Sequence, residues 1–166
     1  MKRLWWMLLA FALPVLALAP GDPVALPKVQ DSYGKPIDLA ATAREGKYLL
    51  FWFYPRASSP GCTAQGKRYA ELYEEFKKLG VEIFGVSADP AADQCTFIEQ
   101  MALKGAMLPD KDGTLARLFK VGGVFGFYNR DTILVNPRGR IERVWRNVNA
   151  FRDPDTVLAY VREIKR

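Results

Sequence analysis

The sequence predicts an α/β fold with a central mixed β-sheet flanked by helices. Two runs that fit buried strands are each followed by a predicted helix: the first by apolar residues at three- and four-residue spacings, the second by an Asp-Pro helix start. Further along the chain, two short strand patterns joined by a turn indicate an antiparallel pair, and a last helical segment follows them. The chain has 166 residues, of which 49% are hydrophobic and 25% charged, and this suits one globular domain.

The first 19 residues are expected to be a leader rather than part of that domain. Met1 to Arg3 is basic, Leu4 to Ala19 is apolar without a charge, and Ala17 to Ala19 resembles the cleavage site of a secretory signal. We interpret residues 1–19 as a signal peptide or an uncleaved N-terminal anchor, and residues 20–166 as the folded domain. Both interpretations predict an extracytoplasmic protein that is periplasmic, secreted or held at a membrane through residues 4–19.

The first half of the domain predicts a hairpin, two buried strands and two helices. The hairpin pairs Leu26–Gln30 with Ile37–Leu39 across a turn at 31–34. The run Tyr48–Tyr54 is apolar throughout and predicts a central strand, which Pro55 closes. A helix over about 61–79 follows, with an apolar stripe expected to pack in the core and Gly80 as its stop. Val81–Ser87 predicts the next strand, and Asp89-Pro90 opens a helix that runs to about Leu103.

The second half predicts shorter elements. We expect a turn at 110–113, a short helix over 115–119, a flexible apolar loop over 122–126, a strand over 131–135, a turn at 136–139, a partner strand over 140–145 and a final helix that starts at Asp153. The apolar positions of that final helix lie on one face, which is typical of a helix that covers a sheet.

The composition excludes several classes of site. The chain has no histidine, which removes Cys–His dyads, Ser–His–Asp triads and imidazole metal ligands. Its two cysteines allow one disulfide and are too few for a zinc site, so no metal or cofactor is expected. The net charge of +6 comes from scattered basic residues rather than a dense patch with stacking aromatics, so no nucleic-acid partner is expected.

Cys62 is the candidate nucleophile. Ser59-Pro60-Gly61-Cys62 resembles a helix start, because serine suits the N-cap and proline the first helical position. Cys62 would then lie in the first turn, where unpaired backbone N–H groups and the helix dipole favour a thiolate. Such a thiolate attacks an O–O bond or a disulfide. Without its surroundings, however, a cysteine here fits a small buried residue better than a nucleophile.

The surroundings of Cys62 resemble a known family. The run from Tyr54 to Thr63 (YPRASSPGCT) is similar to the peroxidatic motif of the peroxiredoxins, Pro-x-x-x-Thr/Ser-x-x-Cys, in the form found in the bacterioferritin-comigratory (Q-type) branch. Arg130 to Gly139 resembles the family's catalytic-arginine strand, and Tyr33 to Leu39 resembles its N-terminal hairpin. The likeness extends from about residue 24 to the end of the chain. It implies a thioredoxin-like fold and a thiol-dependent peroxidase for hydrogen peroxide and alkyl hydroperoxides.

The resemblance also implies roles for individual residues. Cys62 is the peroxidatic cysteine, Ser59 holds the peroxide and the thiolate, and Pro55 shields the sulfur. Arg130, although distant in sequence, is expected beside Cys62, where its fixed charge stabilises the thiolate and polarises the peroxide. Gln65 stands where the family often has glutamate, and this exchange is expected to weaken the network that orients the arginine.

The resemblance leaves the resolution step open. Many Q-type members carry a resolving cysteine five residues after the peroxidatic one, where this chain has Lys67. Cys95, on the second predicted helix, is the remaining candidate, through an intramolecular Cys62–Cys95 disulfide. The alternatives are a one-cysteine enzyme with Cys95 simply buried, or a permanent structural disulfide. The implied partners are a peroxide and a thioredoxin-like dithiol reductant, and the protein is expected to be a monomer or a weak dimer.

Two other functions compete with the peroxidase. An extracytoplasmic thiol–disulfide oxidoreductase of thioredoxin type needs Cys-x-x-Cys, and here the fourth position is Gln65. A non-catalytic thioredoxin-like binding protein, such as a copper-delivery protein, usually needs a close cysteine pair and a histidine, and the sequence has neither.

Overall fold

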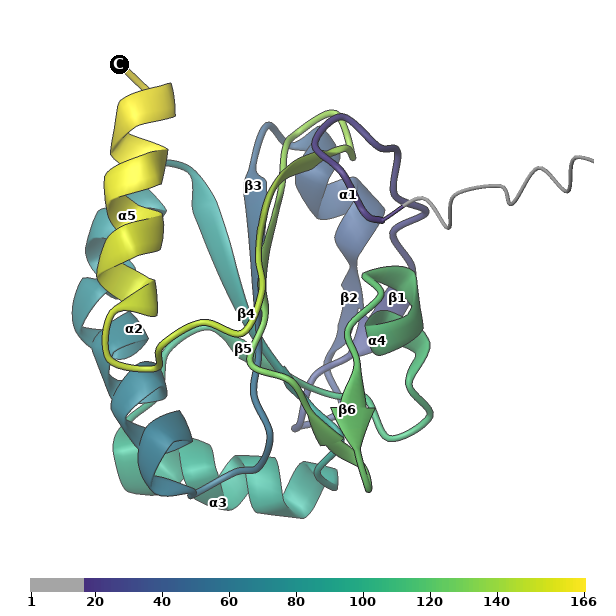
Figure 1. Ribbon diagram of the computed structural model, residues 1–166, viewed down its shortest axis with the longest axis vertical. Helices are drawn as coiled ribbons and strands as arrows, with labels where there is room; N and C mark the ends of the chain where they lie inside the picture. The colour runs from purple at the N-terminus through teal and green to yellow at the C-terminus, as the bar shows by residue number, and fades with distance from the viewer. Residues whose placement is uncertain (1–16) are drawn as a thin grey trace, which may run out of the picture.

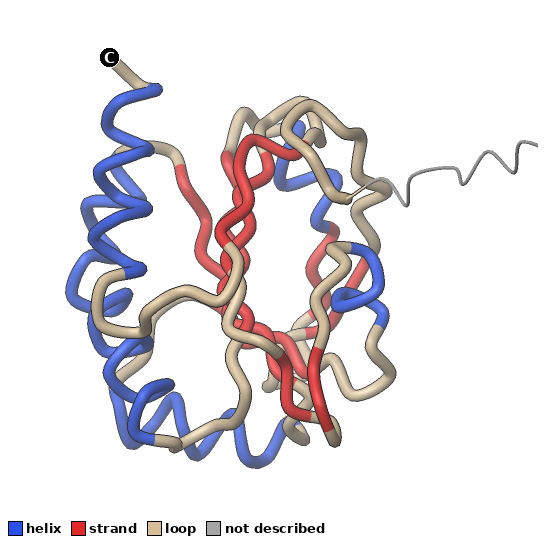
Figure 2. The backbone as a smooth tube through the Cα atoms, in the orientation of Figure 1, coloured by secondary structure: helices blue, strands red, loops and turns tan. Residues whose placement is uncertain are grey.

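A five-stranded sheet divides the molecule into two layers of different make-up. The structure is a computed structural model and describes residues 17–166. Two helices, α2 (Pro60–Lys78) and α5 (Asp153–Ile164), lie on one side of the sheet (Figure 1). On the other side lie α1 (Leu39–Arg44), α4 (Thr114–Leu118) and the N-terminal hairpin. The strands occupy the middle of the molecule with helices on either side (Figure 2), as the sequence predicts.

The sheet is mixed and has the order β5-β4-β3-β8-β9. Its centre, β3 (Tyr48–Phe53), pairs in parallel with β4 (Val81–Ser87), which pairs in parallel with β5 (Ala106–Pro109). On its other edge β3 pairs antiparallel with β8 (Thr132–Val135), and β8 pairs antiparallel with β9 (Ile141–Trp145). The mixed sheet is therefore confirmed, but β5 is a strand that the sequence did not predict.

The two core clusters follow from the alternation of side chains along β3. Leu50 and Trp52 point into the cluster that is closed by α2 and α5, whereas Phe51 and Phe53 point into the cluster that is closed by α1 and α4. Successive strand residues face opposite sides, and both sides of β3 are apolar, so this strand is buried on both faces.

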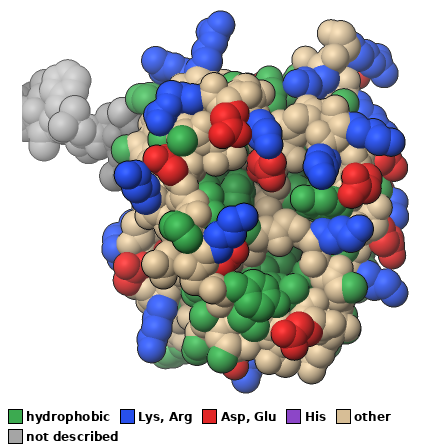
Figure 3. Space-filling model, turned by 180° about the vertical axis from the view of Figure 1, so that it is seen from behind, with side chains coloured by type: hydrophobic (Ala, Val, Ile, Leu, Met, Phe, Trp, Pro, Cys, Tyr) green, Lys and Arg blue, Asp and Glu red, His purple; other side chains and the backbone are tan. Residues whose placement is uncertain are grey.

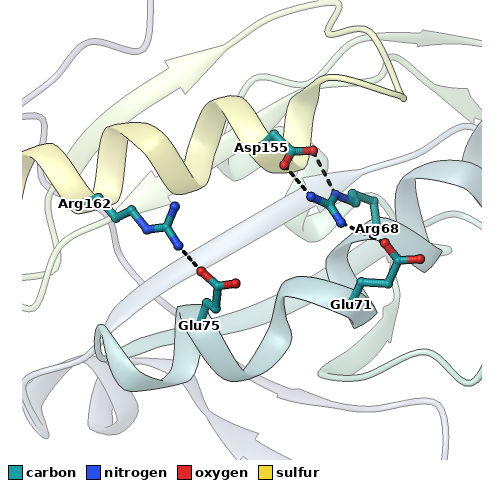
Figure 4. Close-up of polar contacts among 5 residues, drawn as sticks. All are labelled: Arg68, Glu71, Glu75, Asp155 and Arg162. Carbon is teal, nitrogen blue, oxygen red and sulfur yellow. Dashed lines mark hydrogen bonds and ion pairs between the residues drawn. The ribbon is translucent and has the colours of Figure 1, made fainter.

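Exposed ion pairs join the two helices that cover the first cluster. The guanidinium of Arg68 on α2 donates from Nε and Nη2 to the two carboxylate oxygens of Asp155 on α5, at 2.9 and 2.7 Å (Figure 4). Arg68 also pairs with Glu71, and Arg162 of α5 pairs with Glu75 of α2 (Figure 4). These pairs are solvent-exposed and each contributes at most about 1 kcal/mol, so apolar packing, rather than charge, holds α5 on α2.

Several predicted boundaries need correction. The N-terminal hairpin forms between β1 (Lys28–Gln30) and β2 (Pro36–Asp38), but Leu39 starts α1, which was not predicted. The side chain of Asp38 caps α1 by accepting from the backbone N–H of Ala41 at 3.0 Å. The apolar loop over 122–126 is not simply a loop, because β6 (Gly123–Val124) and β7 (Phe127–Tyr128) pair as a small hairpin. Both missed features are too short for a periodic pattern.

Most of the predicted leader, residues 1–16, lies outside the described residues. Across residues 17–166, no helix combines the length and the hydrophobicity that a membrane crossing needs.

On the face opposite to the view of Figure 1, basic and acidic side chains are intermixed around apolar ones (Figure 3).

Candidate active site

Cys62 lies in the first turn of the longest helix in the described part of the chain. Helix α2 starts at Pro60, with Ser59 as its N-cap residue in an extended conformation. Cys62 is completely buried. The Ser59 side chain makes no capping hydrogen bond, so its hydroxyl is not used to cap the helix. The first turn therefore directs unpaired backbone donors and the positive end of the helix dipole toward the sulfur.

Arg130 brings a fixed positive charge to the same sulfur. It follows the β6–β7 hairpin and precedes β8, and its Nη1 and Nη2 lie 3.5 and 3.6 Å from the Cys62 Sγ. Gly61 leaves room for this approach, because a Cβ at that position would lie 3.0 Å from Arg130 Nη2. A guanidinium that presents two donors to one sulfur stabilises a thiolate and can polarise a bound oxygen.

Arg130 is itself held by a chain of buried polar groups. Its Nη1 also donates to Oε1 of Gln65 at 2.7 Å, and Gln65 Nε2 donates to Oδ2 of Asp153 at 2.9 Å. Gln65 is completely buried, and Asp153 is only 3% exposed. Glutamine thus keeps the contact to Arg130 and continues it to a carboxylate; whether it weakens the arginine's network stays a prediction.

Asp153 is the end of that chain and its most heavily used acceptor. Besides Gln65, Tyr69 and Thr132 donate their hydroxyls to Oδ2, at 2.5 and 2.9 Å. The other oxygen, Oδ1, is buried and has no hydrogen-bond partner within residues 17–166. Burial raises the pKa of Asp153, and the hydrogen bonds from Tyr69, Gln65 and Thr132 oppose this shift. Burial and the neighbouring carboxylate likewise raise the pKa of Tyr69 well above its usual range.

Two further predicted residues, Pro55 and Cys95, form no hydrogen bond with the polar groups around Arg130 that are described above. Pro55 is half-buried in the loop between β3 and α2, and Ser58 in that loop has a φ of 62°, which is unusual for a residue other than glycine. Cys95 lies on α3 (Ala91–Met101) and is not bonded to Cys62, since both are free thiols. The Cys95 thiol instead donates to the carbonyl oxygen of Ser32 at 3.3 Å.

The structure thus brings together three residues that the sequence singled out, Cys62, Arg130 and Gln65. It adds three that were not assigned to the site, Tyr69, Thr132 and Asp153. Tyr69 belongs to the apolar stripe of the predicted helix over about 61–79, which was expected to pack in the core. It does pack there, but its hydroxyl also donates to Asp153. Asp153 was interpreted only as a helix start. Across residues 17–166, no group of cysteine and carboxylate side chains is arranged to hold a metal ion.

The comparisons with known proteins identify the family of this chain. The sequence model of the AhpC/TSA family matches residues 20–144. Peroxiredoxin Bcp of Xanthomonas campestris pv. campestris is 34% identical over 124 residues, which cover 70% of this chain and 78% of the relative. Peroxiredoxin Bcp of Escherichia coli K12 is 30% identical over 153 residues, which cover 88% of this chain and 97% of the relative. The chain is a peroxiredoxin of the AhpC/TSA family, in its Bcp branch.

Solved structures agree with this assignment. The bacterioferritin comigratory protein of Xanthomonas campestris, whose structures concern its alkyl peroxide reduction activity, superposes with a TM-score of 0.79 and 29% identity. That superposition covers 89% of this peroxiredoxin and all (100%) of the neighbour. The thioredoxin-like α/β fold with a central mixed sheet and an N-terminal hairpin is confirmed, and so is the enzyme class, a thiol peroxidase. The two competing functions, a Cys-x-x-Cys oxidoreductase and a non-catalytic binding protein, are set aside.

Proposed function

We propose that Cys62 is the peroxidatic cysteine of this peroxiredoxin. The observation that carries the proposal is the paired contact of Arg130 Nη1 and Nη2 with the Cys62 sulfur at 3.5 and 3.6 Å. Cys62 also lies in the first turn of α2, where backbone donors stabilise negative charge. The other cysteine, Cys95, has a backbone carbonyl as its contact, which offers no such stabilisation.

In the proposed first step, the Cys62 thiolate attacks one peroxide oxygen, an S–O bond forms and the O–O bond breaks. The departing oxygen takes up a proton and leaves as water or an alcohol, and Cys62 becomes a sulfenic acid. Arg130 stabilises the charge on the sulfur before attack and on the leaving oxygen afterwards. Ser59 supplies a hydroxyl that is not engaged in helix capping, and Pro55 limits the access of water to the sulfur.

In the proposed second step, Cys95 resolves the sulfenic acid. The Cys95 sulfur attacks the Cys62 sulfur, a disulfide forms and water leaves. A dithiol reductant of thioredoxin type then reduces the disulfide to two thiols. Disulfide geometry requires the two Cα atoms to come within about 4.4–6.8 Å of each other, and the Cys95 thiol has to leave the Ser32 carbonyl for this bond to form. A cavity of about 230 Å³ lies between the loop that precedes Cys62 and α3; its lining comprises Arg56, Ala57, Ser58, Asp89, Asp93 and Thr96.

The proposed substrates are hydrogen peroxide and alkyl hydroperoxides. The alkyl peroxide reduction activity of the Xanthomonas campestris relative supports the second class. We also propose that the domain works outside the cytoplasm, because residues 1–19 have the composition of a signal peptide or anchor. Cell fractionation with an antibody against the domain tests this location: recovery of the full-length chain in the cytoplasm alone contradicts it.

The activity is tested by counting thiols. We expect one equivalent of peroxide to remove two thiols per chain within seconds in the wild type, and to remove none rapidly in Cys62→Ser. In Cys95→Ser, we expect one thiol to be lost and a sulfenic acid at Cys62 to be trapped by dimedone. Rapid loss of the remaining thiol in Cys62→Ser, or slow loss in the wild type, overturns the role of Cys62. Normal turnover of Cys95→Ser with a dithiol overturns the role of Cys95.

A further inference from the structure

A chain of buried hydrogen bonds leads from Arg130 through Gln65 to Asp153. The proposed function, on which this inference rests, does not by itself explain this chain. It does not end at Gln65 but continues to a carboxylate on α5. In sequence, Gln65 and Asp153 are 88 residues apart, and in the fold they form a hydrogen-bonded pair. Two buried side chains that meet in this way restrict one another, because an unpaired buried polar atom costs free energy.

The partners fix the orientation of the Gln65 amide. A guanidinium only donates hydrogen bonds, and an ionised carboxylate only accepts them. Gln65 Oε1 therefore has to face Arg130, and its Nε2 has to face Asp153, as the distances of 2.7 and 2.9 Å show. Acceptance by a carboxylate polarises the amide, which makes its oxygen a stronger acceptor for the guanidinium.

The same pair explains why glutamine suits this position in this chain. A glutamate at position 65 would bring a second carboxylate within hydrogen-bond distance of Asp153 Oδ2. Two buried carboxylates at such a distance cannot both ionise, so one has to keep a proton. With glutamine, these hydrogen-bonded residues hold one negative charge. It lies on Asp153 and acts on Arg130 through the polarised amide of Gln65.

We propose that Asp153 is a positioning residue for Arg130, and that Gln65 and Asp153 together replace a single carboxylate beside the arginine. Asp153 does not touch the Cys62 sulfur; it acts through the Gln65 amide. Tyr69 from α2 and Thr132 from β8 hold Asp153 in place by donating to the same oxygen, Oδ2. The charged and titratable groups that face this pair are Arg130 and Tyr69. Within the pair, Asp153 titrates in the wild type, and position 65 titrates as well when glutamate replaces Gln65.

A double-mutant cycle tests the pair, because two of the four proteins in the cycle hold the same number of carboxylates. The wild type and the double variant Gln65→Glu/Asp153→Asn each hold one carboxylate, whereas Gln65→Glu holds two and Asp153→Asn none. The double variant restores a contact between an amide and a carboxylate with reversed polarity, since the asparagine Nδ2 at position 153 donates to the new glutamate. The asparagine Nδ2 has two hydrogens, one for the glutamate and one for either the Tyr69 or the Thr132 hydroxyl, both of which can accept. The other hydroxyl loses its partner, so the double variant restores the charge pattern at some cost in stability.

We expect the effect of Gln65→Glu on the rate of the reaction with peroxide to change sign when Asp153 is replaced by asparagine. Gln65→Glu alone should slow the reaction of Cys62 with hydrogen peroxide roughly tenfold or more. The loss should grow as pH rises and the shared proton is released. In the Asp153→Asn background, the same substitution should speed the reaction and bring it near the wild-type rate. The measurement is the single-turnover rate of thiol loss against pH, in a Cys95→Ser background so that one thiol reports.

Asp155→Asn is the matched control. It makes the same chemical change on the same helix, two residues along, but Asp155 is exposed and pairs with Arg68. We expect it to leave the rate and its pH profile unchanged in combination with either residue at position 65. If Gln65→Glu acts in the same direction and by the same factor with aspartate or asparagine at 153, Asp153 does not position Arg130 and the proposal is wrong. Equal rates for the wild type and Gln65→Glu at every pH overturn it as well.

A second readout separates this proposal from the proposed function. The pH midpoint of the Cys62 thiolate absorbance and its rate of alkylation by iodoacetamide report the Cys62–Arg130 contact without peroxide. If Cys62 does not react with peroxide, the proposed function fails, but the cycle is still read from these two measurements. If Cys62 reacts and the four variants show independent effects, only the role of Asp153 fails. Thermal denaturation identifies a variant that is merely unfolded, and Gln65→Glu/Asp153→Asn then supplies the decisive comparison.

Discussion

The two helices that carry the cysteines are held in different ways. Helix α2 has 19 residues and buries six of them: Cys62, Gln65, Gly66, Tyr69, Leu72 and Phe76. Helix α3 has 11 residues and buries two, Gln94 and Phe97. The sulfur that must meet Arg130 therefore lies on a helix fixed along most of its length. The other thiol lies on a helix whose fully buried side chains are one aromatic ring and one amide, with Ile98 and Met101 packed half-buried against the core.

The amide on α3 is the centre of a small buried network. Gln94 donates to the Ser87 hydroxyl at 2.9 Å and to the Leu108 carbonyl at 3.1 Å, and it accepts from the Ser32 hydroxyl at 2.8 Å. The Cys95 thiol contacts the carbonyl of the same Ser32. A segment with few buried apolar contacts opens locally at low free-energy cost, so α3 is the element expected to move if Cys95 resolves Cys62.

The largest expected effect comes from removing the aromatic ring of α3. Phe97 is fully buried, and its ring centroid lies 5.7 Å from that of Tyr54. Phe97→Ala should lower stability by about 3–5 kcal/mol. Because α3 has no other buried apolar side chain, we expect its amides to lose protection while α2 stays protected. Hydrogen exchange measured by mass spectrometry, together with urea unfolding, checks this pattern.

Phe76→Ala is the matched variant on α2. Phe76 is equally buried but belongs to a helix with five further buried residues, so its loss should weaken the whole domain rather than one helix. Both variants leave a cavity of the same chemistry. If they produce the same pattern of hydrogen exchange, the contrast between the two helices does not hold.

The second prediction concerns the buried amide. Gln94→Leu should cost about 1–3 kcal/mol, because it removes three buried hydrogen bonds, although the Ser32 and Ser87 hydroxyls each keep one other contact. If opening of α3 limits the resolution step, Cys62–Cys95 disulfide formation should accelerate, by about tenfold for each 1.4 kcal/mol lost. Quenched-flow alkylation with mass spectrometry follows the disulfide. Gln100→Leu makes the same change at an exposed position of α3 and should alter neither quantity.

The sequence predicted the long elements and the residues nearest the sulfur. β3 and β4 are apolar runs of six and seven residues, which identify buried strands, whereas β5 has four residues between Gly105 and Asp110 and shows no period. Cys62 and Arg130 could be predicted because a local motif and a resemblance marked them. Asp153 could not, because an aspartate before proline at a helix start fits the ordinary preference for acidic residues in a first turn. Its burial depends on how α5 packs against α2 and β8, which local sequence does not encode.

A third prediction concerns the α2 side of the comparison. Gly61→Ala places a methyl group 3.0 Å from Arg130 Nη2, and the guanidinium has to shift away. We expect the reaction with peroxide to slow roughly tenfold, because misplacement of a stabilising charge acts directly on the rate. Thermal stability should stay close to that of the wild type, since Gly61 is a half-buried residue in the first turn. A wild-type rate for this variant would mean that the close approach of Arg130 to Cys62 is not needed for the reaction.

The smallest expected effect is a dependence of stability on pH that arises from Asp153, at the start of α5. Burial raises the pKa of Asp153 in the folded protein above its ordinary 3.8. The folded state therefore holds this proton at pH values where the unfolded chain has released it. The stability that this proton contributes is complete below pH 3.8 and is lost as pH rises through the folded-state pKa. Asp153→Asn removes the titration, so the wild type should lose stability relative to this variant as pH rises across that window, by at most about 1.4 kcal/mol per pH unit.

Asp155, two residues further along α5, should give the opposite sign. Its hydrogen bonds with Arg68 lower the pKa of its carboxyl below 3.8, so its contribution is complete above pH 3.8 and is lost as pH falls through the folded-state value. Solvent screens this exposed pair, so the slope should be shallow and should vanish at high salt. Urea unfolding of the wild type, Asp153→Asn and Asp155→Asn between pH 3 and 7 (roughly the range in which carboxyls titrate) separates the two signs. If Asp153→Asn instead gains stability relative to the wild type as pH falls, Asp153 is an ordinary stabilised carboxylate. Its charge then costs the fold nothing, and the burial of Asp153 has no electrostatic consequence.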